Sequence, residues 1–443
     1  MKFTTEPLEN RQVALTIEVE PERVASEMQK AARRLAGRGR IPGYRKGKAP
    51  YAVVARHYGE EVIFEEMLDG FMDDALREAL QETGIEPYAP AILTDITRDP
   101  LTLKLTVPLP PDVELGSYRE IRKEFPEITV TDEEVNEALE RIRRDQGSWV
   151  PVDKPAGKGD MIFVTFTGTV GGEKVFEETE DFPLIIGETY GEPLPGFSGR
   201  LEGAKPGDDL EFTLTAPDDH PKKELAGKTC EFRVHVVSVR TLDIPPLDDD
   251  LAKMVGDYDT LDALRARVRE ALVEERKRQA EDQFEADVLD MIVAQSTIQY
   301  PPVALEEELD ELMEDIEAQL KRQERDLDSY LNLAGQTREE FRESLKPRAE
   351  RNLHRSLVLA RIRDAEKIEV DPQEFAEAYE EIKEHYTRAG VPAEVLEKSG
   401  LAERFYTHML TEKVLERIRQ IATGQAPAIP EANPEGDEGA GED

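Results

Sequence analysis

The chain has 443 residues, and its 57 Lys and Arg against 96 Asp and Glu give a formal net charge of −39 at pH 7. At about 150 residues per domain, this length predicts roughly three domains rather than one compact fold. A surface this acidic repels nucleic acid over most of its area, which excludes general DNA binding.

Cysteine, histidine and apolar content exclude further classes of protein. The single cysteine, Cys230, rules out an internal disulfide and a thiolate metal site. The histidines are too scattered to hold a metal on one helix face. No run of about 18 apolar residues is present to span a membrane, and residues 1–20 lack the pattern of a secretory signal. We therefore expect a cytoplasmic protein with no cofactor, no metal and no membrane partner.

The first part of the chain has the pattern of a small α+β unit. Apolar residues recur at strand spacing or at helical spacing in alternate segments. The expected elements are a half-buried strand at 11–20, a helix from Pro21, a helical stretch between Pro50 and Gly84, and paired strands at 90–99 and 101–109. Pro110 and Pro111 end the unit, because proline cannot donate to a strand ladder.

A change to period-two patterning marks the middle of the chain. Thr131 and Glu134 form a capping box that begins one helix. Apolar residues then alternate in several segments between 149 and 243, and the turn at 170–173 contains two glycines. This pattern predicts an antiparallel β domain. Because one helix precedes it and many follow, we expect the β domain to be inserted in a helical domain, with its two ends close together.

Helical spacing dominates from residue 244 to residue 424. Thr337 with Glu340 forms a second capping box, and Asp371 precedes a first-turn proline. The apolar positions rarely continue as strict heptads, so helical hairpins are favoured over a long coiled coil. Residues 425–443 are acidic and rich in proline and glycine, and we expect them to be disordered.

Residues 33–48, RRLAGRGRIPGYRKGK, are an exception to the acidic surface. They contain bases and no acid, namely Arg33, Arg34, Arg38, Arg40, Arg45, Lys46 and Lys48. Glycine recurs through the segment, so we expect a loop that fits closely to a surface, with guanidinium groups able to bind phosphates. The functional interpretation is a docking tip for RNA or for an acidic protein face. The alternative is a loop that is merely solvated, or that is paired with the protein's own acids.

At the end of this segment, GYRKGKAP (residues 43–50) resembles the ribosome-docking signature of the trigger factor family, which reads Gly-Phe-Arg-x-Gly-Lys-x-Pro. Only Tyr44 departs from it, in place of phenylalanine. The resemblance implies that this loop contacts a ribosomal protein of the large subunit beside the exit tunnel, and nearby ribosomal RNA. The residues it assigns to ribosome binding are Gly43, Tyr44, Arg45, Lys46, Gly47, Lys48 and Pro50.

The β region has a second resemblance, to FKBP-type prolyl isomerases. The motifs VTFTG, KVFEE, DFPLIIG and PLPGFSGRLEGAKPGD occur in the order of that family. By resemblance, the catalytic pocket comprises Phe166, Phe176, Glu177, Phe182, Leu194, Phe197, His220 and Phe232. Glu177 stands where stand-alone isomerases have aspartate, Phe197 where they have tryptophan, and His220 where they have a loop tyrosine. The alternative for each phenylalanine, and for Phe232 above all, is a plain core role.

Prolyl isomerisation suits a site without a nucleophile. The barrier to rotation about the X-Pro bond is ~18–20 kcal/mol, because amide resonance must be broken. A dry apolar cup disfavours the planar, charge-separated amide relative to the twisted one. Aromatic side chains are therefore the expected catalytic equipment, and Cys230 is expected to be a buried apolar residue rather than a reactive thiol.

These patterns and resemblances predict a multidomain α+β protein with an N-terminal α+β docking domain, an FKBP-like antiparallel β domain and an all-α C-terminal domain with helical arms. The expected boundaries are 1–112 for the docking domain, 113–148 for a linker and helix, 149–243 for the isomerase domain, 244–424 for the helical substrate-binding domain and 425–443 for the tail. By resemblance, the arms form a cradle for unfolded chains. The alternative is that Leu309, Ile316, Leu353, Leu357, Phe375, Tyr379 and Phe405 pack helix against helix.

The expected function is that of an ATP-independent, ribosome-associated chaperone with peptidyl-prolyl isomerase activity, since no phosphate-binding loop is present. Its expected partners are the large ribosomal subunit near the exit tunnel, nascent and unfolded polypeptides, and a second copy of the chain off the ribosome. Two alternatives stay open. One is an FKBP-type isomerase whose helices serve only for dimerisation, with no ribosome role, and the other is an acidic helical scaffold with an inactive peptide-binding domain.

Overall fold

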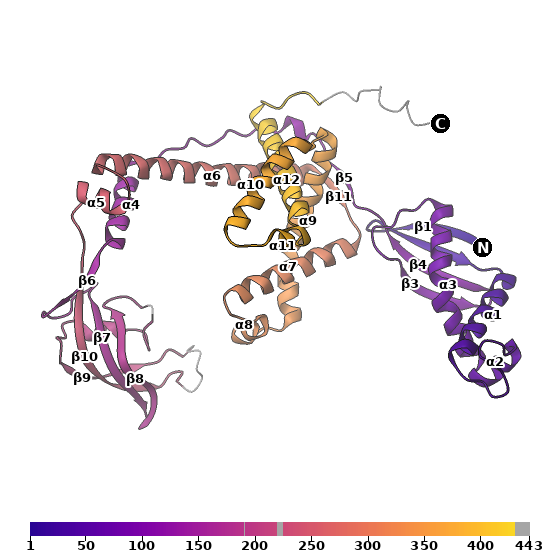
Figure 1. Ribbon diagram of the computed structural model, residues 1–443, viewed down its shortest axis with the longest axis horizontal. Helices are drawn as coiled ribbons and strands as arrows, with labels where there is room; N and C mark the ends of the chain where they lie inside the picture. The colour runs from indigo at the N-terminus through magenta and orange to yellow at the C-terminus, as the bar shows by residue number, and fades with distance from the viewer. Residues whose placement is uncertain (190, 219–224, 430–443) are drawn as a thin grey trace. The chain divides into compact units, whose positions relative to one another are not determined.

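The computed structural model describes residues 1–189, 191–218 and 225–429. The chain divides into two compact units, one formed by Met1–Phe125 with Gln283–Asp443 and the other by Pro126–Asp282. The long helix α6 (Leu261–Gln295) contributes to both (Figure 1). Among the described residues, no helix combines the length and the apolar character that crossing a membrane requires.

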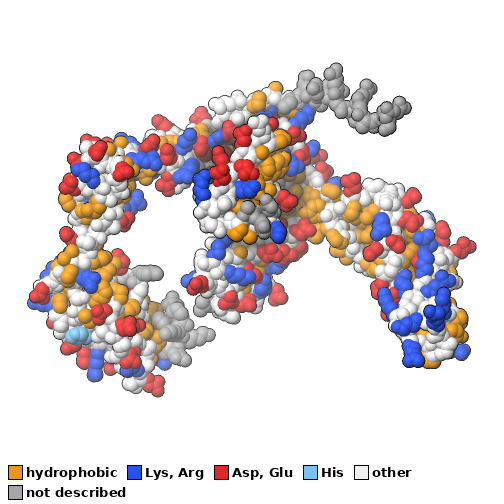
Figure 2. All heavy atoms as spheres, in the orientation of Figure 1, with side chains coloured by type: hydrophobic (Ala, Val, Ile, Leu, Met, Phe, Trp, Pro, Cys, Tyr) orange, Lys and Arg blue, Asp and Glu red, His pale blue; other side chains and the backbone are white. Residues whose placement is uncertain are grey.

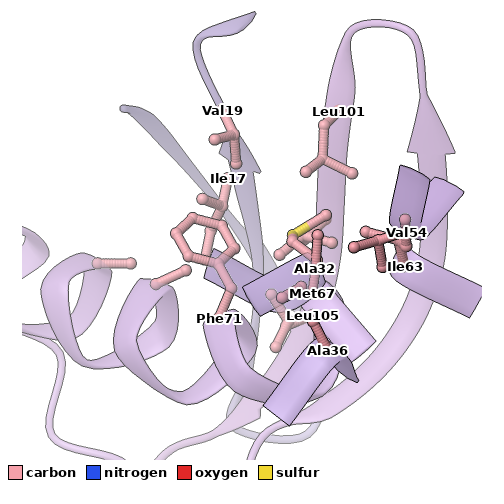
Figure 3. Close-up of a cluster of buried hydrophobic side chains, with 14 of the residues drawn as sticks. Ile17, Val19, Ala32, Ala36, Val54, Ile63, Met67, Phe71, Leu101 and Leu105 are labelled. Carbon is pink, nitrogen blue, oxygen red and sulfur yellow. The ribbon is translucent and has the colours of Figure 1, made fainter. Parts of the chain in front are cut away.

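The first unit begins with a four-stranded antiparallel sheet in the order β1-β2-β4-β3. Its strands are β1 (Lys2–Leu8), β2 (Gln12–Glu18), β3 (Ile92–Arg98) and β4 (Leu101–Pro108), and its helices are α1 (Pro21–Arg38), α2 (Tyr51–Tyr58) and α3 (Glu60–Thr83). Alternate residues of β2 and β4 pack against α1 and α3 in one apolar core, in which Ile17, Leu105 and Met67 are buried (Figure 3). The predicted α+β unit is confirmed.

Three details of this unit differ from the sequence prediction. The edge strand β1 was not predicted, because it is almost wholly exposed and shows no apolar alternation. The helical stretch before Gly84 is two helices, since Gly59 has φ +91° and separates α2 from α3. The prediction that the basic segment is a loop from residue 33 is wrong, because α1 continues to Arg38. Ala32 and Ala36 are buried there, and this packing outweighs the glycine at 37.

The rest of the first unit is helical. It contains the short strands β5 (Asp112–Glu114) and β11 (Thr297–Gln299), the 3₁₀ turn η1 (Tyr118–Glu120), and helices α7 (Pro302–Arg322), α8 (Leu327–Ala334), α9 (Arg338–Glu366), α10 (Pro372–Arg388), α11 (Ala393–Lys398) and α12 (Leu401–Thr423). The capping box at Thr337 and the Asp371 cap are both present, as predicted. The prediction of a disordered tail falls mostly on residues 430–443, which lie outside the described residues.

The second unit contains the β domain. Its elements are α4 (Asp132–Asp145), β6 (Ser148–Val152), β7 (Met161–Val170), β8 (Glu173–Ile185), η2 (Ser198–Leu201), β9 (Asp209–Thr215), β10 (Thr229–Asp243) and α5 (Asp249–Val255), followed by the first part of α6. The antiparallel sheet has the order β6-β10-β7-β8, and β9 also pairs with β10. Gly171 and Gly172, both with positive φ, form the predicted tight turn between β7 and β8.

The two ends of the β domain meet, as the sequence predicted. Ser148 at the start of β6 pairs with Asp243 at the end of β10. Beyond this pair, the buried face of α4, with Val135 and Leu139, packs against Leu264 of α6. The β strands are thus inserted between helices that pack on one another.

Candidate functional site

Five phenylalanines from four elements come together in the β domain. Phe166 lies on β7, Phe176 and Phe182 on β8, Phe197 immediately before η2, and Phe232 on β10. The ring centroid of Phe197 lies 5.0 Å from that of Phe232 and 5.1 Å from that of Phe166. The rings of Phe166 and Phe182, and those of Phe176 and Phe232, have centroids 5.6 Å apart. The structure therefore brings all five predicted rings into one cluster.

Burial in this cluster falls from one side to the other. Phe197 and Phe232 are buried, with exposed fractions of 0% and 1%, and Leu194 is buried beside them. Phe176 and Phe182 are only partly buried. The cluster therefore has a closely packed apolar side, which we call its floor, and a partly exposed side, which we call its rim.

Gly168 of β7 lets two of the rings approach each other. It pairs with Phe176 on one neighbouring strand and with Phe232 on the other. A Cβ atom at this position would lie 2.8 Å from Phe232 Cε1 and 2.9 Å from Phe176 Cδ2. Sequence reasoning missed this role, although the glycine that ends VTFTG was its visible signal.

Two of the predicted polar pocket residues are not placed among the rings. The carboxylate of Glu177 is about half exposed and forms an ion pair with Lys174 Nζ at 2.6 Å. His220 lies outside the described residues. Phe212 of β9 was missed, although its ring centroid is 5.3 Å from that of Phe197, because the alternation of β9 indicated only a core strand. Cys230 is buried, as expected, and burial raises the pKa of its thiol.

The loop after α1 presents the second predicted site. Gly47 N–H donates to Ala36 O at 2.8 Å, and Lys48 N–H donates to Arg45 O at 3.0 Å, so the loop folds back on the helix. Ile41 and Ala49 anchor its two ends in the core. Tyr44, between these anchors, is 45% exposed, so its ring is accessible to a partner.

The cations of the basic segment fall into two groups. Arg34 Nε and Arg38 Nη1 pair with the carboxylate of Glu66 on α3, at 2.8 and 2.7 Å, so for these two the intramolecular pairing alternative holds. Within the described ranges, Arg33 of α1 and the loop cations Arg40, Arg45, Lys46 and Lys48 form no ion pair with a carboxylate and are exposed. Figure 2 shows Lys and Arg gathering at the end of the N-terminal part where α1 and α2 lie.

The helices after α6 form two structurally different hairpins. Helices α7, α8 and α9 share a buried core that includes Leu309, with Ile316 partly buried against it, so these two residues pack helix against helix. Leu353 of α9 is also buried. By contrast, α10 has no buried residue among those described. Its Phe375 and Tyr379 are half-buried, with stacked rings whose centroids are 5.6 Å apart, and they face Phe405 of α12.

Three family models match the chain. "Bacterial trigger factor protein (TF)" matches residues 1–142, "FKBP-type peptidyl-prolyl cis-trans isomerase" matches residues 152–237, and "Bacterial trigger factor protein (TF) C-terminus" matches residues 260–419. The isomerase match contains the five clustered rings, and the first match contains the basic loop.

Similar proteins extend over almost the whole chain. A trigger factor of Carboxydothermus hydrogenoformans is 34% identical over 403 residues, which are 90% of this chain and 93% of that protein. One of Dehalococcoides mccartyi is 31% identical over 447 residues, covering 99% of this chain and 98% of that protein. A solved structure, "Promiscuous Substrate Recognition in Folding and Assembly Activities of the Trigger Factor Chaperone", covers 95% of this chain with a TM-score of 0.51 and 24% identity, a likeness of fold.

Proposed function

The chain belongs to the trigger factor family, and from that premise we propose how its parts divide the work. The protein is a ribosome-associated chaperone that carries an FKBP-type peptidyl-prolyl isomerase domain. In our proposal it acts in the cytoplasm, without ATP or a cofactor, on nascent and unfolded polypeptides. The division is docking at 1–112, a linker and helix at 113–148, isomerisation at 149–243, substrate binding at 244–424 and a tail at 425–443.

The loop at 39–50 is proposed as the contact with the large ribosomal subunit near the exit tunnel. The observation that carries this proposal is the contrast between Arg34 and Arg38, which Glu66 neutralises, and the exposed cations of the loop. A guanidinium or ammonium group without an internal partner is available to a phosphate or to an external carboxylate. Both ribosomal RNA and a ribosomal protein therefore fit this tip.

Replacing Tyr44, Arg45 and Lys46 together by alanine tests the docking proposal. We expect co-sedimentation with ribosomes to be lost while isomerase activity on an X-Pro peptide is kept, because the substitutions lie outside the ring cluster. A double variant with Arg322→Ala and Arg325→Ala controls for lost positive charge, since both residues are exposed at the end of α7 and in the following turn. Unchanged co-sedimentation of the triple variant would rule out this loop as the anchor.

The ring cluster is proposed as the isomerase pocket. In this proposal the substrate proline contacts the partly exposed rim rings Phe176 and Phe182. The buried side chains of Phe166, Leu194, Phe197 and Phe232 form the packed floor beneath them. The apolar surroundings favour the twisted amide over the planar one, whose carbonyl oxygen carries more charge. Glu177 and His220, the polar members of the pocket expected by resemblance, are proposed to orient the peptide.

The hairpin of α10 and α12 is proposed as a client-binding surface. Phe375, Tyr379 and Phe405 are only half-buried, whereas Leu309 and Leu345 of the other hairpin lie in its core. Ile382, Tyr386, Leu401 and Phe405 line a groove of about 620 Å³ between α10 and α12. Shallow aromatic surfaces of this kind bind many sequences weakly. Off the ribosome, the same surface is available to a second copy of the chain, as a homodimer.

A further inference from the structure

Glu192 lies in the segment between β8 and η2, next to the floor of the ring cluster. Its Oε2 atom accepts a hydrogen bond from Gly196 N–H, and its Oε1 atom accepts one from Ser198 N–H, both at 2.8 Å. These two amides lie on either side of Phe197. A single carboxylate therefore holds the peptide groups before and after the residue whose ring forms the floor.

The backbone around Phe197 is also held by hydrogen bonds that do not involve Glu192, among them Arg200 N–H to Phe197 O at 3.1 Å and Gly187 N–H to Ser198 Oγ at 3.3 Å. It belongs to no strand, so no ladder of hydrogen bonds fixes it. Its own N–H donates to Leu194 O at 3.1 Å, and Gly196 makes the turn with φ +87°. The hydroxyl of Ser198 donates to Glu188 O at 3.1 Å, which links the start of η2 to the residues that follow β8. Of three successive amides at the turn, two depend on Glu192.

A shift of this backbone moves the floor of the ring cluster. The Phe197 side chain is completely buried, and its ring contacts those of Phe166, Phe212 and Phe232, with centroids 5.0 to 5.3 Å apart. Protein interiors are close-packed, so a displaced main chain forces the ring and its neighbours to move as well. The rate of isomerisation should then fall, because the rings around the twisted amide are no longer in the positions that fit it.

We propose that Glu192 is a positioning residue for prolyl isomerisation, which fixes the Phe197 backbone and thereby the packed floor that supports the rings of the pocket. This proposal depends on the ring cluster being the isomerase pocket, as proposed above. Glu192 itself has no role in binding the substrate. Its contribution is the geometry of one turn.

The two hydrogen bonds require a carboxylate. Ionised carboxylate offers two oxygen acceptors, and each N–H in this turn points to a different one. Glutamine has one oxygen, and its NH₂ group would face a second N–H donor. Glu192→Gln should therefore disrupt the pair of hydrogen bonds even though the side chain keeps its size. Glu192→Asp keeps both oxygen acceptors on a shorter side chain.

The first measurement is kcat and KM for an X-Pro peptide with the full-length chain. We expect Glu192→Gln to lower kcat/KM about tenfold, mainly through kcat, because the lost geometry matters most for the transition state. Glu192→Asp should recover part of this loss. Glu202→Gln is the matched control, because it removes the same charge from an exposed position at the end of η2 and should keep the parent activity.

The second measurement separates positioning from general stability. In Glu192→Gln, hydrogen exchange measured by NMR should become faster at the amides of Gly196 and Ser198, because the glutamine side chain cannot accept from both. Amides of β10 should exchange as in the parent. A residue that only stabilised the domain would change exchange throughout the sheet.

The outcomes are separable. A Glu192→Gln protein with kcat/KM within about twofold of the parent overturns the proposal, and so does unchanged hydrogen exchange at Gly196 and Ser198. Phe197→Leu serves as the reference for the pocket itself. If Phe197→Leu is also fully active, the ring cluster is not the pocket and the earlier proposal fails, whereas a slow Phe197→Leu with an active Glu192→Gln refutes only the role of Glu192. If Glu192→Gln does not fold, the kinetics and the amide exchange of Glu192→Asp decide.

Discussion

Glu366, near the end of α9, is a fully buried carboxylate surrounded by donors. It accepts hydrogen bonds from Tyr118 Oη and Arg119 Nε at 2.7 Å, and from Arg417 Nη1 at 2.9 Å. Burial alone would raise the pKa of Glu366, but these hydrogen bonds and the positive charge of Arg119 lower it below its ordinary value. Burial and the hydrogen bond to Glu366 raise the pKa of Tyr118 to about 12. One side chain thus joins η1, α9 and α12.

Glu366→Gln should destabilise the helical region by about 1.5–3 kcal/mol at neutral pH, because hydrogen bonds to a charged group are lost. The folded pKa of Glu366 is depressed, so its contribution is present above the ordinary value of 4.5 and is lost as pH falls toward the folded pKa. The difference in unfolding free energy between parent and variant should therefore shrink from pH 7 to pH 4. Denaturant unfolding at both pH values measures it, with Glu369→Gln, an exposed neighbour, as the control. A difference that is independent of pH would contradict this assignment.

Single residues were predictable where a motif fixed them. The resemblance selected Phe166, Phe182 and Phe197, and their rings do lie together. Glu192 could not be found in this way, because its partners are backbone amides whose direction depends on a turn that residue types do not specify. Gly168 was visible in its motif, but the space it leaves for the rings of Phe176 and Phe232 depends on the register of three strands.

At the scale of elements, strand β7 offers the sharpest test of the ring cluster. Gly168→Ala should push apart the rings of Phe176 and Phe232, because the added methyl group would lie under 3.0 Å from each. We expect a loss of about 1–3 kcal/mol in stability from overpacking and a slower isomerisation of an X-Pro peptide. Gly199→Ala in η2 is the matched control, since its Cβ atom would meet nothing within 4 Å. Equal activity and stability in the two variants would show that the rings are not held as described.

Elements with local signals were predicted well, and elements set by distant contacts were not. The capping boxes at Thr131 and Thr337 place the starts of α4 and α9 correctly, because a cap is a local arrangement. Strand β1 was missed, since it owes its structure to pairing with β2 rather than to its own pattern. Helix α1 extends further than predicted, because packing of Ala32 and Ala36 outweighs the local preference of Gly37.

At the scale of the whole molecule, charge acts in two opposite directions. The net charge of −39 repels the phosphates of the ribosome at long range. The exposed cations of the loop at 39–50 attract them at short range, while Arg34 and Arg38 are neutralised by Glu66. Attraction from one small tip and repulsion from the remaining surface favour a single orientation of approach. The same balance determines how salt affects binding.

Raising the salt concentration should therefore weaken ribosome binding by the parent but not by a loop variant. For the parent, raising salt from about 50 to about 200 mM should weaken co-sedimentation with ribosomes, because counterions compete for the sites that Arg45 and Lys46 occupy. For a variant with Arg45→Gln and Lys46→Gln, the attraction is largely removed and repulsion remains, so the weak residual association should stay constant or rise as salt screens it. The control with Arg322→Ala and Arg325→Ala keeps the loop and should follow the parent.

A parent that binds equally at both salt concentrations would contradict an electrostatic anchor, and a loop variant that weakens as steeply as the parent would place that anchor elsewhere on the chain.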